Sequence, residues 1–184
     1  MIIAGGFIGD FLKGPVADDL PPALALGVRL HRRIDAFSNQ HEMIRRSCNR
    51  FPDRLRRIAP PLVDVIADYL LATNWQAHHD NTLVEFSRQT YVHIEAGSDY
   101  LPAHGQEFFA WMVENDLLTS YTEWDSAQRG MRSVTRRLRR QELNELLMSE
   151  LPQLVDDLRT DFDGYFPDLQ THANGWLSAA QQSS

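Results

Sequence analysis

The sequence predicts an all-α fold in which a single domain, residues 1–184, forms a helical bundle. Three observations support this fold class. Apolar residues recur every three or four positions through several long segments, as they do on the buried face of a helix. Proline, glycine and polar clusters separate these segments, and no segment alternates apolar and polar residues like a half-buried strand. With 184 residues, of which 43% are hydrophobic, the chain is long enough to bury one sizeable core.

The first part of the chain contains both turns and helices. The Gly5-Gly6 pair and the segment GDFLKG (9–14) indicate a short element that ends in a tight turn. Pro22 can begin a helix, because proline is favoured in the first helical turn. The later helices follow polar or proline-containing breaks. The pattern predicts helices from Pro22 to Phe37, from about Pro61 to Trp75, from Leu83 to Gly97, from after Gly105 to Leu117, from Thr122 to Leu138 and from Gln141 to Trp176.

Two residues interrupt the later helical patterns. Gly130 lies in the middle of its segment, where glycine costs about 1 kcal/mol relative to alanine unless another element packs closely against it. Pro152 is expected to break or kink the last helix. The complete pattern gives six or seven helices.

The composition excludes several classes of protein. A net charge of -7 argues against general affinity for nucleic acid. The one cysteine, Cys48, cannot form an internal disulfide and fits a reducing compartment. The apolar start has no basic segment before it, as a signal peptide would, and no apolar run approaches the roughly 18 residues of a membrane-spanning helix. We therefore expect a soluble, cytoplasmic protein that does not bind membranes.

Two predicted helices each carry a pair of potential metal ligands. His31 and Asp35 are four residues apart, as are Asp64 and Asp68. Residues at this spacing project from the same helix face, so two packed helices could bring four ligands to one point. Imidazole and carboxylate ligands favour Mn²⁺, Mg²⁺ or iron, and such an ion would support phosphoester hydrolysis. The alternative remains open that these are ordinary exposed acids and a core histidine.

The glycine-bounded turn and the arginines suggest anion binding. Lys13 lies beside Asp10 and could help to hold a phosphate, although the local sequence favours an ordinary turn with a surface lysine. Nine arginines lie between residues 29 and 57 and five between 132 and 140, together 14 of the 18 Lys and Arg residues. Such runs are often solvated helix faces, but they also attract a phosphorylated small molecule, RNA or an acidic protein. The scattered aromatic residues form no stacking motif, which disfavours RNA.

Several motifs in one order resemble the acyl carrier protein phosphodiesterases, also called acyl carrier protein hydrolases. These are GDFLKG (9–14), GVRLHRRIDAFSNQH (27–41), the segment 57–75 with D-V-I-A-D-Y-L-L-A, and more weakly GMRSVTRRL (130–138). The family is similar to a divergent branch of the HD phosphohydrolases, which implies an HD-domain-like helical fold and metal dependence, usually on manganese. The resemblance also implies hydrolysis of 4'-phosphopantetheine from the serine of holo acyl carrier protein.

The same motifs imply a role for each candidate residue. Asp10 would be a ligand or a water-orienting base, Asp35 would orient His31 or bind the ion, and Lys13 or a nearby arginine such as Arg32 would stabilise phosphate charge. The partner would be acyl carrier protein, whose acidity would give the arginine runs a purpose. The implied metal ligands for Mn²⁺, or for Mg²⁺ or Fe²⁺, are His31, Asp64 and Asp68. The implied docking residues are Arg32, Arg45, Arg46, Arg50 and Arg54.

Two departures from the family pattern qualify these roles. Family members usually begin upstream with a segment of the type N-[YF]-L-A-H, so we expect a shortened N-terminus that lacks one histidine. The usual HD dipeptide is absent from the second helix, and we interpret His79-Asp80, in a polar loop, as an accidental match. Two other functions therefore stay open: a phosphohydrolase for a nucleotide or another phosphoester, and a non-catalytic protein that binds acyl carrier protein.

Overall fold

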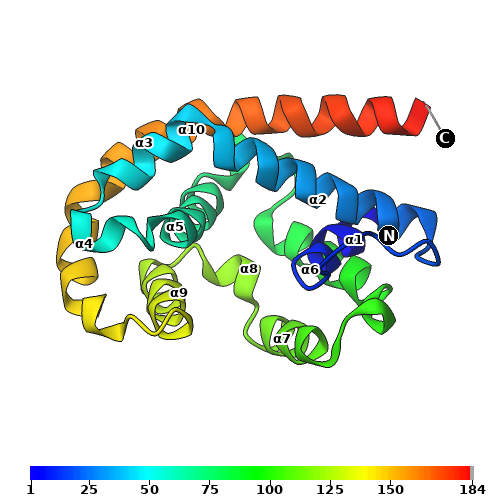
Figure 1. Cartoon of the computed structure of the whole chain (residues 1–184), viewed down its shortest axis with the longest axis horizontal. Helices are drawn as coiled ribbons and strands as arrows, with labels where there is room; N and C mark the ends of the chain where they lie inside the picture. Colours follow the sequence, from blue (N-terminus) through cyan, green and yellow to red (C-terminus); the bar gives the residue numbers. More distant parts are fainter. Residues whose placement is uncertain (183–184) are drawn as a thin grey trace. The chain divides into compact units, whose positions relative to one another are not determined.

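The computed structural model describes residues 1–182, and all of its regular elements are helical. No strand occurs among these residues, which confirms the all-α prediction. The elements in chain order are α1 (Ile2–Gly9), α2 (Pro22–Gln40), α3 (Glu42–Arg50), α4 (Asp53–Arg56), α5 (Ala59–Thr73), η1 (Trp75–Ala77), α6 (Leu83–Glu95), η2 (Ser98–Tyr100), α7 (Ala103–Glu114), α8 (Leu117–Ser120), α9 (Trp124–Arg137), η3 (Gln141–Leu143) and α10 (Asn144–Gln182). Figure 1 shows the helices coloured along the chain.

The chain folds into two compact units, each assembled from separate segments. Unit 1 contains residues 1–37, 81–119 and the segment from 169 onward, whereas unit 2 contains residues 38–80 and 120–168. Of the four boundaries between the units, three fall inside helices, namely α2, α8 and α10, and one falls in the loop before α6. The expectation of a single domain, and that of an HD-domain-like bundle, stay predictions.

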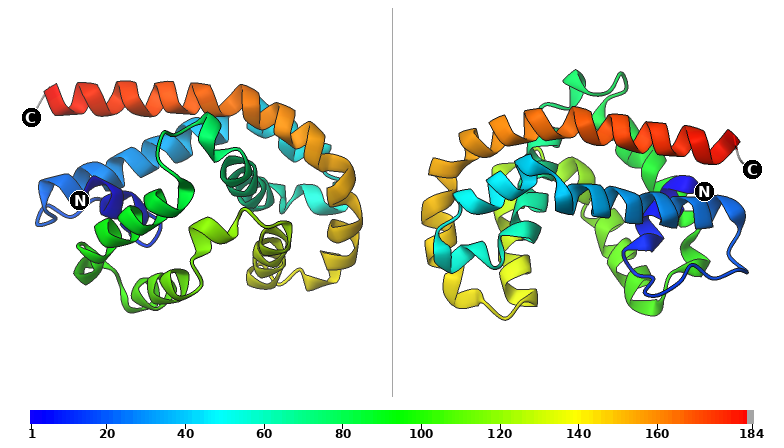
Figure 2. Two further views of the ribbon diagram at one scale, coloured as in Figure 1. Left: turned by 180° about the vertical axis from the view of Figure 1, so that it is seen from behind. Right: turned by 45° about the horizontal axis from the view of Figure 1, so that its top comes forward.

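The core of unit 1 forms where α1 meets α2 and α6. Helix α1 packs against α6 (Figure 2). Glycines lie where α1 crosses α2. A glycine also follows α6, where a Cβ on Gly97 would lie 2.8 Å from the Cβ of Ala4. Side chains with no or little exposure fill the space between these helices: Ala4, Ile8, Leu24, Val28, Ile94, Leu101 and Phe109.

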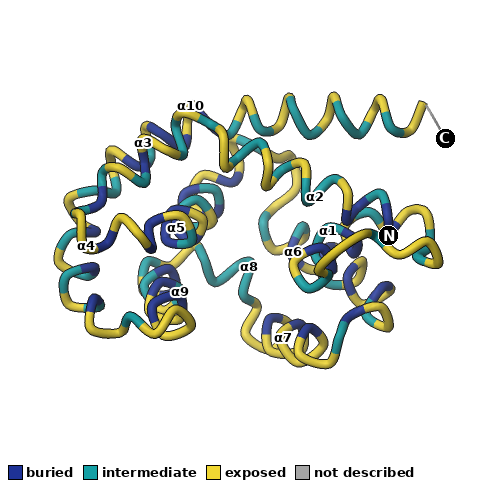
Figure 3. Tube along the Cα trace, viewed as in Figure 1, coloured by how far each residue is buried: buried dark blue, intermediate teal, exposed yellow. Residues whose placement is uncertain are grey.

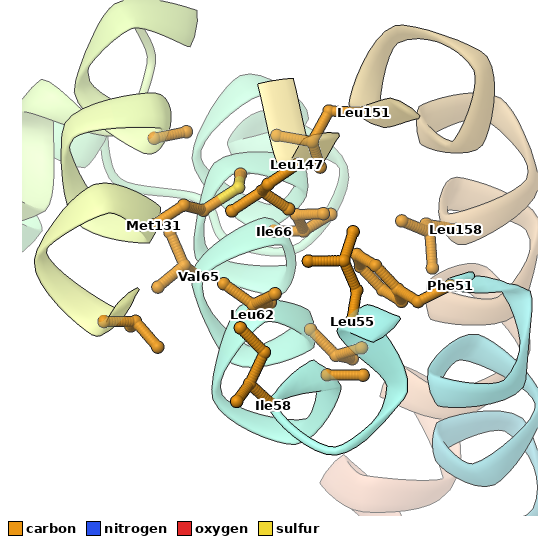
Figure 4. Packing of buried hydrophobic residues seen from close by; sticks show 14 of the residues in the cluster. Phe51, Leu55, Ile58, Leu62, Val65, Ile66, Met131, Leu147, Leu151 and Leu158 are labelled. Atoms are coloured by element: carbon orange, nitrogen blue, oxygen red, sulfur yellow. The ribbon is translucent and has the colours of Figure 1, made fainter. Parts of the chain in front are cut away.

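The core of unit 2 surrounds α5. Leu62, Val65 and Ile66 project from α5 toward α9 and the first half of α10 (Figure 4). Helix α9 packs on α5 at Gly130, where a Cβ would lie 3.0 Å from Val65 Cγ1. Close packing of α5 against Gly130 therefore accounts for a glycine in the middle of α9, where it would otherwise weaken the helix.

Some local expectations differ from the structure. The expected tight turn follows Asp10, but Gly5, Gly6 and Gly9 belong to α1 itself, where Gly5 and Gly9 allow the helix to approach α2. The short helices α3, α4 and α8 were not predicted, and they bring the α-helices within residues 1–182 to ten instead of six or seven. Of the two effects expected at Pro152, a break does not occur, because α10 continues through the proline as one helix, but this first half of α10 bends (Figure 1) and carries buried residues along it (Figure 3).

Within residues 1–182, no helix combines the length and the apolar character needed to span a membrane.

Candidate functional site

The first part of the candidate site depends on the contact between α1 and α2. Both helices have glycine where their backbones meet: a Cβ on Gly5 would lie 2.2 Å from the Leu24 carbonyl oxygen, and one on Gly27 would lie 2.1 Å from the Ile2 carbonyl oxygen. Any side chain at either position would force the helices apart. This contact places the C-terminal end of α1 beside the middle of α2.

His31 lies between two carboxylates at this place. Its Nε2 is 3.4 Å from Asp10 Oδ1 and 3.2 Å from Asp35 Oδ2. Asp10 is the C-cap of α1, and Asp35 follows His31 by one helical turn on α2. The side chains of Asp10 and Asp35 are 66% and 57% exposed, whereas that of His31 is 20% exposed. The structure therefore brings together three of the residues predicted from the sequence, with the imidazole shielded and both carboxylates open to solvent.

The turn after Asp10 adds positive charge to this cluster. Arg32 Nη2 donates a hydrogen bond of 3.3 Å to the carbonyl oxygen of Leu12, which anchors the guanidinium on the turn. Lys13 is exposed in the same turn. Gly14 has a φ of 81°, a conformation that glycine adopts without strain, and it ends the turn. Lys13 thus lies on the segment that follows Asp10, and Arg32 reaches the same segment from α2.

Asp64 and Asp68 lie on α5 in unit 2, and both are exposed. Both residues therefore reach solvent, although apolar residues surround them in the sequence. The protein packed around the Asp68 carboxyl group still removes part of its hydration, and this desolvation raises its pKa to about 7; the charge of Asp64 adds to the effect. Burial, together with the charge of Asp68, also raises the pKa of the Tyr121 phenol, which therefore keeps its proton.

These side chains are of the types that bind a divalent cation, but their present arrangement does not bring three of them to one point. Donor atoms on one octahedral ion lie about 3 Å apart, close to the separation of His31 Nε2 from each carboxylate. No group of three or more His, Cys, Asp or Glu side chains in the described part of the chain is placed to hold a metal ion. Binding would require the exposed Asp10 and Asp35 carboxylates to turn. The predicted convergence of His31 with Asp64 and Asp68 joins residues of two units and remains a prediction.

Two of the arginines predicted to dock a partner bind an internal carboxylate instead. Arg46 Nε donates to Asp161 Oδ1 at 2.5 Å, and Arg50 Nε donates to Asp161 Oδ2 at 2.6 Å. Ser47 Oγ donates a further bond of 3.0 Å to Asp161, whose side chain is only 1% exposed. This network joins α3 to α10 within unit 2. Arg45 and Arg54 are exposed, so they are better placed to meet a partner.

Sequence reasoning missed two residues that organise these parts. Gly9 packs against the His31 ring, and its spacing of one helical turn from Gly5 is the signal that could have revealed a close helix crossing. Asp161 lies on the same helix face as Leu158, Phe162 and Tyr165, which are all buried. A carboxylate within such an apolar stripe signals a buried ion pair.

Comparisons with known proteins agree with the motif resemblance. The family model described as acyl carrier protein phosphodiesterase matches residues 1–169. A relative of that name from Escherichia coli is 27% identical over 94% of this chain and 90% of its own length. One from Klebsiella pneumoniae is 27% identical over 91% of this chain and 87% of its own. The match to one from Photorhabdus laumondii, also at 27%, spans 66% of this chain and 62% of that relative. No solved structure gives a significant match.

Proposed function

Because this chain belongs to the acyl carrier protein phosphodiesterase family, we propose that it hydrolyses the phosphodiester between 4'-phosphopantetheine and the serine of holo acyl carrier protein. The products are apo acyl carrier protein and the free prosthetic group. The observation that carries this proposal is the His31 imidazole held between Asp10 and Asp35, next to the cationic turn at Lys13. An imidazole oriented by carboxylates and flanked by positive charge suits general acid and base chemistry on a phosphate.

The residues of unit 1 provide most of what this hydrolysis requires. Water adds to phosphorus as the bond to the serine oxygen breaks, so one proton leaves the water and one reaches the serine oxygen. His31 Nε2 is the atom placed to take the proton from the water and to pass a proton to the serine oxygen, while Asp10 and Asp35 orient the ring. Arg32, anchored on the Leu12 carbonyl, stabilises the negative charge that develops on the phosphate oxygens.

The proposal includes a divalent cation, Mn²⁺ or alternatively Mg²⁺ or Fe²⁺. His31, Asp64 and Asp68 would hold it, with Asp10 or Asp35 as a further ligand, because imidazole and carboxylates are the donors that these ions accept. When bound, the cation neutralises phosphate charge and lowers the pKa of coordinated water. We also propose a cytoplasmic location, which the single cysteine supports.

The direct test is a mass measurement on holo acyl carrier protein. With Mn²⁺ present, we expect the carrier protein to lose its prosthetic group, and we expect a panel of nucleotides and simple phosphodiesters to remain intact. Prior treatment with a chelator should reduce turnover at least about 100-fold, and added Mn²⁺ should restore it, because the developing charge loses its electrostatic stabilisation. An electron paramagnetic resonance titration of free Mn²⁺ should show binding that His31→Gln weakens.

Three results would redirect the proposal. Cleavage of a nucleotide with no action on the carrier protein would favour a different phosphohydrolase. Carrier-protein binding without release of the prosthetic group, even with Mn²⁺, would favour a non-catalytic binding protein. Full turnover in the presence of chelator, with no Mn²⁺ binding, would remove the metal from the mechanism while leaving hydrolysis in place.

The exposed arginines near the start of unit 2 give a prediction about partner binding. We expect Arg45→Glu and Arg54→Glu each to weaken binding of the acidic carrier protein by roughly fivefold at low salt, and less at high salt, because charges at the rim of an interface are screened. Arg88→Glu is the control, since it makes the same charge change at an exposed position on α6, outside both arginine runs. Isothermal titration at two salt concentrations measures the effect. Equal weakening by all three variants would show that only net charge matters.

A further inference from the structure

A close contact between α1 and α2 lies directly behind the His31 ring. A Cβ built on Gly9 would lie 2.6 Å from His31 Cδ2 and 2.9 Å from His31 Cγ. Carbon atoms that are not bonded to one another make favourable contact at about 3.5 to 4.0 Å, so even a methyl group at this position would collide with the imidazole. Only glycine leaves the ring in its present place.

The helices themselves have no freedom to relieve such a collision. Gly5 and Gly27 bring the backbones of α1 and α2 into direct contact, with a Cβ on Gly5 only 2.9 Å from the Cα of Gly27. Ala4 and Ile8 of α1 are fully buried on the same side of the helix. Since the crossing is fixed at these positions, crowding at Gly9 falls on the side chain of His31, whose ring can turn about its own bonds.

We propose that Gly9 is a positioning residue for His31. Because Gly9 has no side chain, the imidazole can lie against α1 with Nε2 facing Asp10 and Asp35. This inference rests on the proposed hydrolase function, in which Nε2 handles the proton. Displacing a catalytic group by about 1 Å can reduce turnover by about 100-fold. A methyl group at Gly9 therefore impairs the chemical step through the ring, without touching the substrate.

The chain contains a matched control for this proposal. Gly6 belongs to the same helix, but a Cβ built on it has no neighbouring atom within 4 Å. Gly6→Ala and Gly9→Ala add the same methyl group to the same helix, and they differ in the space around it. We expect Gly9→Ala to lower kcat on holo acyl carrier protein about 100-fold with little change in KM, and Gly6→Ala to leave both unchanged.

A spectroscopic measurement separates positioning from general damage. In a ¹³C–¹H correlation spectrum of the whole protein, the His31 Cδ2 signal, assigned by its absence in His31→Ala, should shift in Gly9→Ala and stay in place in Gly6→Ala. An unchanged His31 signal together with kcat within about twofold of the wild type in Gly9→Ala would overturn the proposal. If the wild-type protein were inactive on holo carrier protein, the proposed function would be rejected. The spectra would still decide whether Gly9 positions the His31 ring.

A double substitution covers the case in which Gly9→Ala does not fold. In His31→Ala the two closest contacts of a methyl group at position 9 are gone and the Cβ of residue 31, at 3.1 Å, remains, so we expect His31→Ala to restore most of the thermal midpoint that Gly9→Ala loses. If Gly9→Ala is destabilised equally with and without the His31 ring, the collision is with the backbone, and Gly9 is a packing residue instead. Non-additivity of the two changes is the expected signature of a direct contact.

Discussion

Replacing His31 with glutamine should lower kcat on holo acyl carrier protein by about 10³-fold, because a positioned acid or base contributes typically 10²-fold to 10⁴-fold and an amide cannot exchange the proton. Glutamine keeps a polar group of similar reach next to Asp10 and Asp35, so helical content and the thermal midpoint should change little. Initial rates from the mass assay measure the effect, and circular dichroism measures the fold.

His93→Gln is the control for this substitution. His93 lies exposed in the last turn of α6 and has no part in the candidate site, so its replacement should leave kcat unchanged. If His31→Gln kept more than about a tenth of wild-type turnover, the imidazole would not be the group that handles the proton. The carboxylates of Asp64 and Asp68 would then be the next residues to test.

The second large effect is expected on stability, from Asp161→Asn. This carboxylate is buried between α3 and α10 and accepts hydrogen bonds from Arg46, Arg50 and Ser47. An asparagine has the same shape but no charge, so Arg46 loses this counter-ion and Arg50 keeps only the exposed Asp157. Removing one partner of a buried pair costs about 3 to 5 kcal/mol, and because Arg46 is partly exposed we expect about 3 kcal/mol. Denaturant unfolding at pH 7 measures the free energy of unfolding.

Asp157→Asn supplies a matched control on the same helix. Asp157 is 61% exposed and pairs with the same Arg50 guanidinium, at 2.5 Å from its Nη1. An exposed pair contributes at most about 1 kcal/mol, so this replacement should have a much smaller effect. Similar losses of stability in the two variants would show that burial of Asp161 does not strengthen its ion pairs.

The same carboxylate predicts how stability depends on pH. Burial alone would raise the pKa of Asp161, but the hydrogen bonds from Arg50, Arg46 and Ser47 outweigh it and hold the pKa below its usual value. A carboxyl with a lowered pKa in the folded state adds stability above its unfolded pKa, near 3.9, and this stability disappears as the pH falls through the folded value. Asp161→Asn should therefore show a weaker loss of stability below about pH 4 than the wild type.

Much of the fold could be predicted because it depends on local periodicity. The helices around Leu24, Leu62 and Met131 follow apolar spacing that is visible in the sequence, and proline and glycine mark several of their ends. Pro152 was expected to break or kink the last helix; the helix bends in that half but is not broken, and leucines on both sides of the proline, Leu151 and Leu158, are buried in the core. Tertiary packing can maintain a helix that its own sequence disfavours.

The candidate site, like the fold, could be predicted only in part. The sequence alone determined which chemistry is available: spaced motifs supplied His31, its carboxylates and the family to which they belong. Only the tertiary structure decided that Arg46 and Arg50 bind Asp161, that Asp64 and Asp68 face solvent, and that Gly9 seats the imidazole. The physical reason is that ligand type and helical spacing are local properties of a chain, whereas the neighbour of a side chain depends on residues far away in the sequence.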